Sequence, residues 1–119
     1  MKYLFICYPK CSTCKKAKKF LEDNNIEFEE RNIKEENPSF DELRTWIKKS
    51  NYDIKKFFNT SGILYREMNL KEKLLTMTEE EKIELLARDG MLVKRPILIG
   101  EETVLVGFKE KEWKLLTRK

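Results

Sequence analysis

The chain has 119 residues, of which 40% are hydrophobic and 39% are charged, and its formal net charge is +4. This length suits a single domain whose core needs no metal or disulfide cross-link. No apolar run reaches the roughly 20 residues of a membrane-spanning helix, and the N-terminal apolar stretch is too short for a signal peptide, so we expect a cytoplasmic protein without membrane contact. Interleaved lysines and glutamates indicate solvated helix faces and argue against direct DNA binding.

The chain contains three cysteines and no histidine. An odd number of cysteines argues against the disulfide framework of a secreted protein. A tetrahedral zinc site lacks ligands within one chain, so we expect no metal, with zinc bridged between subunits as the open alternative. The missing histidines also exclude Cys-His and Ser-His catalysis. An activated nucleophile would therefore depend on a helix dipole, backbone amides and cations.

The first third of the chain predicts a strand, a helix and a second strand. Residues 3–7 form a continuous apolar run, typical of a strand covered on both faces. A helix is predicted to begin with Ser12 or Thr13 as its N-cap and to end near Asn24, because its apolar residues recur at helical spacing. Residues 26–29 alternate as a strand does. Such a unit places its two strands parallel.

The rest of the chain predicts a helical block followed by a hairpin and a last helix. Ser39 and Thr78 each precede a glutamate by three residues, which is the capping-box spacing at a helix start. Two short apolar runs joined by residues 100–102 predict a β-hairpin, and the last helix carries Trp113. The helices are expected after residue 37, over 71–77 and over 78–88, and the hairpin strands over 97–99 and 103–108.

Cys11 and Cys14 form a C-x-x-C pair at the predicted start of the first helix. Free backbone amides of Ser12 and Thr13 would point toward the Cys11 sulfur, and Lys10 adds positive potential. Both effects favour the thiolate, so Cys11 is predicted to be the nucleophile and Cys14 the thiol that resolves a mixed disulfide. The alternative is two buried cysteines that happen to have this spacing.

Two further features leave alternatives open. Cys7 ends an apolar strand and is interpreted as a small buried hydrophobe, the alternative being a third redox thiol that pairs with Cys11. Pro96 marks the entrance of a strand, and its peptide bond is a candidate for the cis form. Pro96 and Arg95 either shape a groove beside Cys11, with Arg95 binding an anion or the thiolate, or form an ordinary strand start with a surface cation.

Lysines and aromatic residues elsewhere are interpreted structurally. Lysines line one face of the first helix, which predicts a solvated face, the alternative being a docking patch for an acidic partner or for glutathione carboxylates. These are Lys15, Lys16, Lys18 and Lys19. Phe57, Phe58 and Tyr65 are expected in the core, the alternative being a substrate platform.

Four segments together resemble the arsenate-reductase-like (ArsC/Spx/MgsR) family: residues 11–14, 57–62, 85–97 and 106–109. The resemblance covers nearly the whole chain. It implies an α/β, thioredoxin-like fold of the glutaredoxin type, in which β-α-β and β-β-α halves form a mixed sheet. It also implies a single domain, residues 1–119, with a helical insertion at about residues 37–90. Arg95-Pro96 would be the cis-proline motif next to the nucleophilic cysteine.

The family contains arsenate reductases with one cysteine, matching Cys11, and three arginines that hold the oxyanion. Only one of these arginines is matched here, as Arg95, whereas the other two positions carry Asn59 and Phe108. Arg66 does not match a motif position. Because an oxyanion needs several forked donors, the resemblance implies weak arsenate binding.

The Spx-like branch implies a different activity. Its members regulate transcription by binding the C-terminal domain of the RNA polymerase α subunit, and their C-x-x-C disulfide, matched by Cys11-Cys14, is the switch. The glycine associated with polymerase binding falls at residues 52–53, where this chain has Tyr and Asp.

These observations predict a thiol-disulfide oxidoreductase without a bound cofactor, in which Cys11 attacks, Cys14 resolves, and Arg95 with Pro96 shapes the site. Lys10, Ser12, Thr13 and Lys109 are predicted to contact the substrate. The expected reductant is glutathione or a protein dithiol such as glutaredoxin or thioredoxin. The first alternative is an Spx-like regulator that binds RNA polymerase. The second is an arsenate reductase that uses Cys11 and Arg95 with Lys109.

Overall fold

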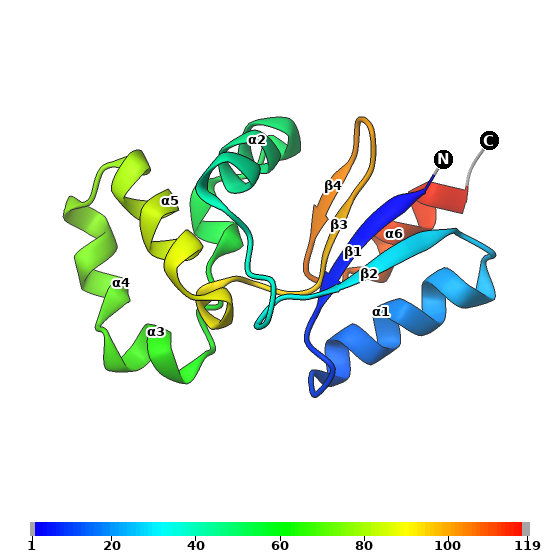
Figure 1. The fold of residues 1–119 in the computed structure, drawn as a ribbon, viewed down its shortest axis with the longest axis horizontal. Coiled ribbons are helices and arrows are strands. Elements are labelled where there is room, and N and C mark those ends of the chain that lie inside the picture. The colour runs from blue at the N-terminus through cyan, green and yellow to red at the C-terminus, as the bar shows by residue number, and fades with distance from the viewer. Residues whose placement is uncertain (1, 118–119) are drawn as a thin grey trace. The chain divides into compact units, whose positions relative to one another are not determined.

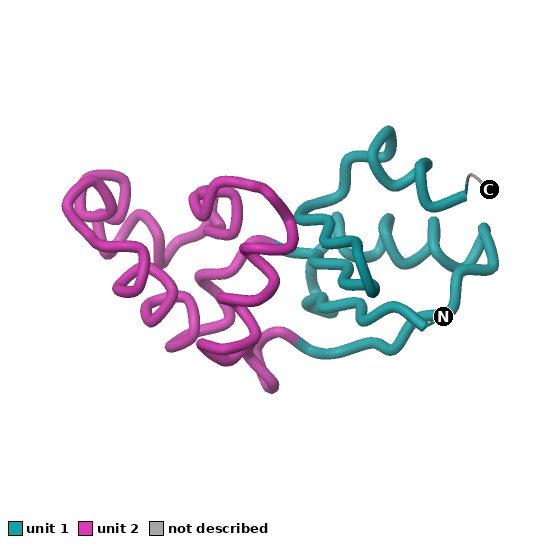
Figure 2. Tube along the Cα trace, turned by 90° about the horizontal axis from the view of Figure 1, so that it is seen from above, with its two compact units in different colours: residues 1–32, 95–119 teal, residues 33–94 magenta. Residues whose placement is uncertain are grey.

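The computed structural model describes residues 2–117, so Met1, Arg118 and Lys119 of the predicted domain lie outside the described residues. The chain divides into two compact units, coloured separately in Figure 2. One unit combines residues 1–32 with residues 95–119, and the other comprises residues 33–94, which include the helical block expected at 37–90. No helix within residues 2–117 has the length and apolarity needed to cross a membrane.

The first unit is built on a four-stranded mixed sheet (Figure 1). Its strands, in the spatial order β2-β1-β3-β4, are β1 (Tyr3–Cys7), β2 (Phe28–Asn32), β3 (Ile97–Ile99) and β4 (Val104–Val106). β1 runs parallel to β2 and antiparallel to β3, and β3 pairs antiparallel with β4. The predicted β-α-β unit, the hairpin and the mixed α/β fold are thereby confirmed.

The position of β2 differs from the prediction. The strand was expected at residues 26–29 but begins at Phe28 and continues to Asn32. Asn25 adopts a left-handed conformation, with φ of 55°, and the Ile26 N–H donates to the Leu21 carbonyl, so these residues still belong to the helix end. Pairing with β1 then carries the strand through charged residues of low β propensity. Charged residues are typical of an edge strand, and β2 is at the edge.

Helices α1 (Ser12–Asp23) and α6 (Glu110–Trp113) pack on one face of this sheet. The core there joins Phe5 of β1 and Leu98 of β3 to apolar side chains of both helices. Trp113 is fully buried, and its ring meets those of Phe5, Phe20 and Phe108 edge-on. Its indole N–H donates to the Gly107 carbonyl across 3.1 Å, so the one polar group of this side chain is satisfied.

The second unit is helical, and its two predicted capping boxes are confirmed. Ser39 and Glu42 exchange hydrogen bonds at the start of α2 (Phe40–Ser50), and Thr78 and Glu81 do so at the start of α5 (Glu79–Arg88). The helix expected over 78–88 ends at Arg88 as predicted, with Asp89 as the C-cap of α5. These signals are local in sequence, which is why they could be read without the tertiary structure.

The centre of the second unit contains short helices. The predicted stretch 71–77 corresponds to α4 (Leu70–Lys73) and the 3-10 helix Leu74–Thr76. Three elements were not predicted: α3 (Ile63–Glu67) and the 3-10 helices Ile54–Phe57 and Gly90–Leu92. They are too short to show an apolar period. Phe57, Phe58 and Tyr65 are buried, which confirms them as core residues.

Candidate functional site

The C-x-x-C pair begins at a tight turn between β1 and α1. The Cys11 N–H donates to the Tyr8 carbonyl across 2.9 Å and closes this turn, in which Pro9 follows Tyr8. The second position of such a turn favours proline, because the proline ring already fixes φ near the value that the turn requires. The Cys11 carbonyl in turn accepts the first helical hydrogen bond, from Lys15.

Cys11 is the N-cap of α1 and is partly buried. The prediction that Ser12 or Thr13 caps the helix is therefore wrong, because the Tyr8–Cys11 turn lets the helix start directly after Cys11. Ser12 and Thr13 instead occupy the first helical turn, where backbone N–H groups have no intrahelical acceptor. The expectation that Cys11 directly precedes the first turn is confirmed.

Cys14 is only 3% exposed, and several donors surround its sulfur. The Tyr8 N–H donates to it across 3.3 Å. Contact with Cys7 contributes most to lowering the pKa of Cys14 to about 6, and burial opposes this effect. The Tyr8 amide, the Cys11 thiol and the charge of Arg95 also lower this pKa. Cys14 is thus the thiol whose surroundings best accommodate a negative charge, a role that the sequence had suggested for Cys11.

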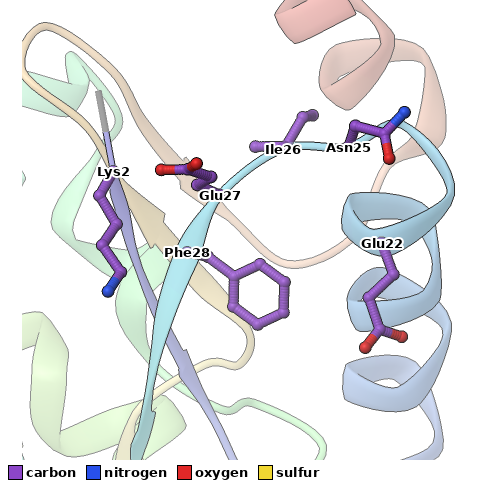
Figure 3. A pocket seen from close by; sticks show the side chains of 6 residues that line it. All are labelled: Lys2, Glu22, Asn25, Ile26, Glu27 and Phe28. Carbon is purple, nitrogen blue, oxygen red and sulfur yellow. The ribbon is translucent and has the colours of Figure 1, made fainter.

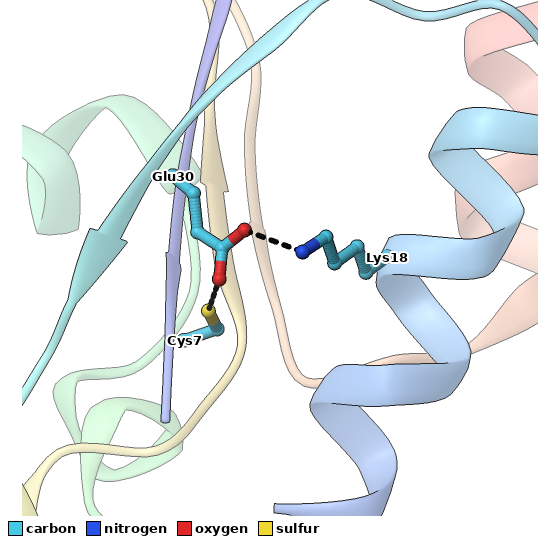
Figure 4. Close-up of polar contacts among 3 residues, drawn as sticks. All are labelled: Cys7, Lys18 and Glu30. Carbon is cyan, nitrogen blue, oxygen red and sulfur yellow. Dashed lines mark hydrogen bonds and ion pairs between the residues drawn. The ribbon is translucent and has the colours of Figure 1, made fainter. Parts of the chain in front are cut away.

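Cys7 is buried, as predicted, but it makes polar contacts. Its thiol donates to a Glu30 carboxylate oxygen across 3.4 Å, and the other oxygen pairs with the Lys18 ammonium across 2.8 Å (Figure 4). Contact with Cys14, burial and the Glu30 carboxylate together raise the pKa of Cys7, so its proton is retained. All three cysteines are free thiols in this structure.

Arg95 has unused hydrogen-bond donors. Its guanidinium lies 5.3 Å from the centre of the Tyr8 ring, a cation-π arrangement. Its Nε and Nη1 atoms are buried and meet no hydrogen-bond acceptor among the described residues. The Arg95-Pro96 peptide bond is cis, as anticipated, and the Pro96 carbonyl accepts from the Gly107 N–H across 2.8 Å.

A pocket of about 190 Å³ opens beside the buried thiols. It is lined by Cys7, Tyr8, Pro9, Cys14, Lys15, Lys18 and Glu30. A larger pocket, of about 700 Å³, lies between the end of α1 and the start of β2 (Figure 3). Its lining contains no cysteine or arginine, so it is separate from the thiol site. Within residues 2–117, no three Cys, Asp or Glu side chains are grouped as ligands of one metal ion.

The predicted site residues fall into two groups. The first group consists of Cys14 with Cys11 and Arg95, because both residues act on the Cys14 thiol. Lys10, Ser12 and Thr13 are exposed around the turn and the helix start, and Lys109 is exposed at the N-cap of α6. Their predicted contacts with substrate stay predictions. Lys15, Lys16 and Lys19 are solvent-exposed as expected, whereas Lys18 pairs with Glu30.

Sequence reasoning missed Tyr8, Lys18 and Glu30 as parts of the site. The relevant signal was present in β1, where alternate residues share a face of the sheet. Phe5 and Cys7 therefore point to the same side, and Glu30, which pairs with Phe5, joins them. The β1–β2 register was needed to make this connection, and the sequence did not provide it.

Comparison with known proteins places these features in context. A model described as the ArsC family matches residues 7–116. The protein YusI of Bacillus subtilis is 56% identical over 113 residues, which cover 95% of this chain and 96% of YusI. The regulatory protein MgsR of the same organism is 31% identical over 115 residues, covering 97% of this chain and 90% of MgsR.

A solved structure shares the whole architecture. The crystal structure of an ArsC family related protein from Bacteroides fragilis superimposes with a TM-score of 0.95 at 58% identity, covering 98% of each chain. The similarity thus extends over both compact units and includes the segment with the three cysteines.

Proposed function

The chain belongs to the ArsC family, and within that family we propose that it acts as a cytoplasmic thiol-disulfide oxidoreductase. The observation that carries this proposal is the unequal exposure of two thiols in contact. Cys11 is partly exposed at the N-terminal end of α1, whereas Cys14 is buried and within hydrogen-bonding reach of Cys11. An outer thiol can meet a substrate disulfide, whereas a buried inner thiol is shielded from the substrate and can reach the outer thiol.

The reaction proceeds by two thiol-disulfide exchanges. Cys11 passes its proton to the neighbouring Cys14 thiolate as its sulfur attacks one sulfur of a substrate disulfide, and the other sulfur leaves as a thiolate that takes up this proton. The Cys14 thiolate then attacks the Cys11 sulfur and releases the second substrate thiol, which leaves a Cys11–Cys14 disulfide. Two glutathione molecules or one protein dithiol reduce this disulfide and are themselves oxidised. Cys14 is suited to the second step, since its pKa of about 6 keeps it ionised at neutral pH.

Arg95 supplies the binding group for an anionic substrate. Its two unpaired donors, on Nε and Nη1, are buried near Cys14 and supported by the Tyr8 ring. A buried donor without an acceptor is costly, so a carboxylate or a departing thiolate that accepts from it binds favourably. Glutathione provides both a carboxylate and a thiolate, and Pro96 shapes the wall of the binding site next to Arg95.

The test is reduction of a glutathione mixed disulfide by the wild-type protein and two variants. We expect Cys11→Ser to lose turnover, whereas Cys14→Ser should accumulate a covalent mixed disulfide at Cys11, visible by intact mass. Cys11→Ser is a mild change to the fold because serine is itself a favourable N-cap. Absence of wild-type turnover with glutathione, glutaredoxin and thioredoxin as reductants would refute the enzymatic proposal.

A second candidate function is redox-sensitive regulation of transcription. It is favoured by the 31% identity to MgsR, a regulatory protein, over 97% of this chain. In this case the Cys11–Cys14 disulfide changes affinity for the C-terminal domain of the RNA polymerase α subunit. Binding of that domain should then differ between reduced and oxidised protein in calorimetry, and equal absence of binding in both states would dismiss this function.

Arsenate reduction is a weaker third candidate. Phe108, at a position where the reductases are expected to carry an arginine, packs its ring against Phe20 and Trp113. An aromatic ring held in this way offers an oxyanion no positive charge, which leaves Arg95 and the exposed Lys109 to bind arsenate. We expect arsenate to stimulate little consumption of reducing equivalents. Saturable, arsenate-dependent consumption that Arg95→Ala abolishes would restore this candidate.

A further inference from the structure

We propose that Cys7 is a third redox thiol, which attacks the Cys14 sulfur of the Cys11–Cys14 disulfide, forms a buried Cys7–Cys14 disulfide and releases Cys11. This proposal rests on the proposed oxidoreductase function, because that reaction produces the first disulfide. It differs from the earlier alternative, in which Cys7 pairs with Cys11. Here Cys14 is the thiol that both partners share.

The geometry that supports the proposal is the clustering of the three thiols at the start of α1. Cys11 packs against the core cluster that contains Cys7 and Cys14, and Cys7 and Cys11 both act to lower the pKa of Cys14. Cys7 and Cys14 also line the same pocket of about 190 Å³ and belong to the same core cluster. Cys7 comes from β1 and Cys14 from the first turn of α1, and the Tyr8 N–H bond to the Cys14 sulfur holds that turn against the end of the strand.

The step is an isomerisation in which no net oxidation or reduction occurs. The bond between the Cys7 and Cys14 sulfurs forms as the bond between the Cys14 and Cys11 sulfurs breaks. The electron pair of the broken bond leaves on Cys11 as a thiolate. The proton of the Cys7 thiol passes to the Glu30 carboxylate, which already accepts its hydrogen bond across 3.4 Å. Glu30 is 39% exposed and can pass that proton to water.

Cys7 is unreactive while Cys14 is a free thiolate. The contact with Cys14 is the largest cause of the raised pKa of Cys7, ahead of burial and the Glu30 carboxylate. When Cys14 enters a disulfide its negative charge disappears, so this cause is removed. Cys7 therefore loses its proton more readily in the oxidised protein than in the reduced one, while burial and the Glu30 carboxylate still raise its pKa.

The electrostatics also favour the products of the exchange. The negative charge leaves on Cys11, which lies at the N-terminal end of a 12-residue helix, where the helix dipole stabilises anions. On Cys7 the same charge would lie beside the Glu30 carboxylate. The disulfide that results joins two side chains that are each only 3% exposed, so an external reductant reaches it less easily than one that includes Cys11.

The Glu30–Lys18 pair fits the role of proton acceptor. Lys18 holds the carboxylate in place across 2.8 Å, and its hydrogen bond lowers the pKa of Glu30, which makes the carboxylate a weaker base but keeps it free of a proton of its own. Glu30 therefore remains an ionised acceptor. The neighbouring Glu29 is exposed and lies on the opposite face of β2, so its substitution is a matched control for the loss of a carboxylate.

Trypsin provides a direct test, because cleavage after Lys10 separates Cys7, in peptide 3–10, from Cys11 and Cys14, in peptide 11–15. The full-length protein is oxidised with diamide, quenched with acid, alkylated with N-ethylmaleimide in denaturant and digested. A Cys11–Cys14 disulfide stays within peptide 11–15 and leaves the alkyl group on Cys7. A Cys7–Cys14 disulfide joins the two peptides and leaves the alkyl group on Cys11.

We expect the joined peptides to appear after the internal disulfide, with the alkyl group on Cys11. The joined peptides should be absent from Cys11→Ser, which cannot form the disulfide that Cys7 attacks, and from Cys14→Ser, which lacks the sulfur that Cys7 joins. Glu30→Gln should slow their appearance about tenfold or more, as loss of a proton acceptor does, while Glu29→Gln leaves the rate unchanged. Formation of joined peptides in Cys14→Ser would instead indicate Cys7–Cys11 pairing and overturn the proposal.

Two other results have distinct meanings. If all oxidised wild-type protein carries the disulfide within peptide 11–15 and the alkyl group on Cys7, the Cys7 proposal is wrong and the oxidoreductase proposal stands. If diamide produces no disulfide in wild-type protein, both proposals fail together. Intact mass before digestion separates these two cases, since a disulfide removes two hydrogens from the protein.

Discussion

The backbone N–H of Tyr8 donates a hydrogen bond to the sulfur of Cys14 across 3.3 Å. Tyr8 precedes the C-x-x-C motif and ends the strand side of the turn, while its ring lies 5.3 Å from the Arg95 guanidinium. One residue outside the motif thus contacts both the buried thiol and the arginine that acts on it. The charge on Cys14 is set by this turn, by Cys7 and by Arg95 together.

The titration of Cys14 should depend on Cys7. In a Cys11→Ser background, thiolate absorbance should rise with a midpoint near the pKa of about 6, because Cys7 contributes most to stabilising the Cys14 thiolate. Adding Cys7→Ala should move this midpoint up toward the ordinary value of 9.0. Cys7→Ser retains a donor and should move it less. An unchanged midpoint in Cys7→Ala would contradict the assigned role of Cys7.

The same shift predicts how stability varies with pH. The folded-state pKa of Cys14 is lowered, so its contribution to the free energy of unfolding is fully present above the unfolded value of 9.0 and is lost as pH falls through about 6. In urea unfolding at a series of pH values, the free energy of unfolding of Cys14→Ser should therefore vary less between pH 6 and 9.0 than that of the wild-type protein. Parallel curves for the two proteins would argue against a lowered Cys14 pKa.

Arg95 should discriminate between charged and neutral substrates. Arg95→Lys keeps the positive charge but loses the forked donors Nε and Nη1. KM for a glutathione mixed disulfide should therefore rise about 10- to 150-fold, which corresponds to the roughly 1.5–3 kcal/mol of a charged hydrogen bond. KM for hydroxyethyl disulfide, which is neutral, should change little. The exposed Arg66 provides the control as Arg66→Lys. An equal loss for both substrates would place Arg95 in a structural role.

The Lys18–Glu30 ion pair should stabilise the fold only slightly. Both side chains are about two-fifths exposed, at 42% and 39%, so solvent screens the attraction and a double-mutant cycle with Lys18→Met and Glu30→Gln should give less than about 1 kcal/mol. The lowered pKa of Glu30 makes its contribution present above 4.5 and lost as pH falls through the folded value. The raised pKa of Lys18 makes its contribution present below 10.5 and lost as pH rises through the folded value.

Urea unfolding at neutral pH and at low pH measures this coupling. It should shrink in acid, as Glu30 becomes protonated, and in high salt. A coupling of several kcal/mol at neutral pH would mean that the pair is far less screened than its exposure indicates.

Substitution of Trp113, at the end of α6, should lower the free energy of unfolding far more than substitution of Leu115, in the 3-10 helix Lys114–Thr117 that follows. It is fully buried among three aromatic rings, so Trp113→Ala should cost about 3–5 kcal/mol of unfolding free energy. Leu115, which is 58% exposed, is the matched control, and Leu115→Ala should stay within about 0.5 kcal/mol of wild type. Similar losses for the two variants in urea unfolding would show that the aromatic cluster contributes little.

Features that depend on neighbours in the chain could be read from the sequence. The apolar run of β1, the capping residues Ser39 and Thr78, and the hairpin after Pro96 all correspond to observed elements. The predicted position of β2 was wrong because its local sequence pattern is weak. β2 was placed two residues early because Glu30 and Arg31 have little intrinsic preference for a strand, and pairing with β1 outweighs that preference.

The sequence by itself determined that a C-x-x-C pair begins a helix, because a strand-like run, a proline turn and a helical period follow one another directly. Only the tertiary structure decided which charges act on the pair. The β1–β2 register brings Cys7 and Glu30 to one face of the sheet, and the packing of α1 on that face brings Lys18 to Glu30. Charge on a thiol depends on donors and carboxylates within a few ångströms, and that proximity arises from strand register and packing.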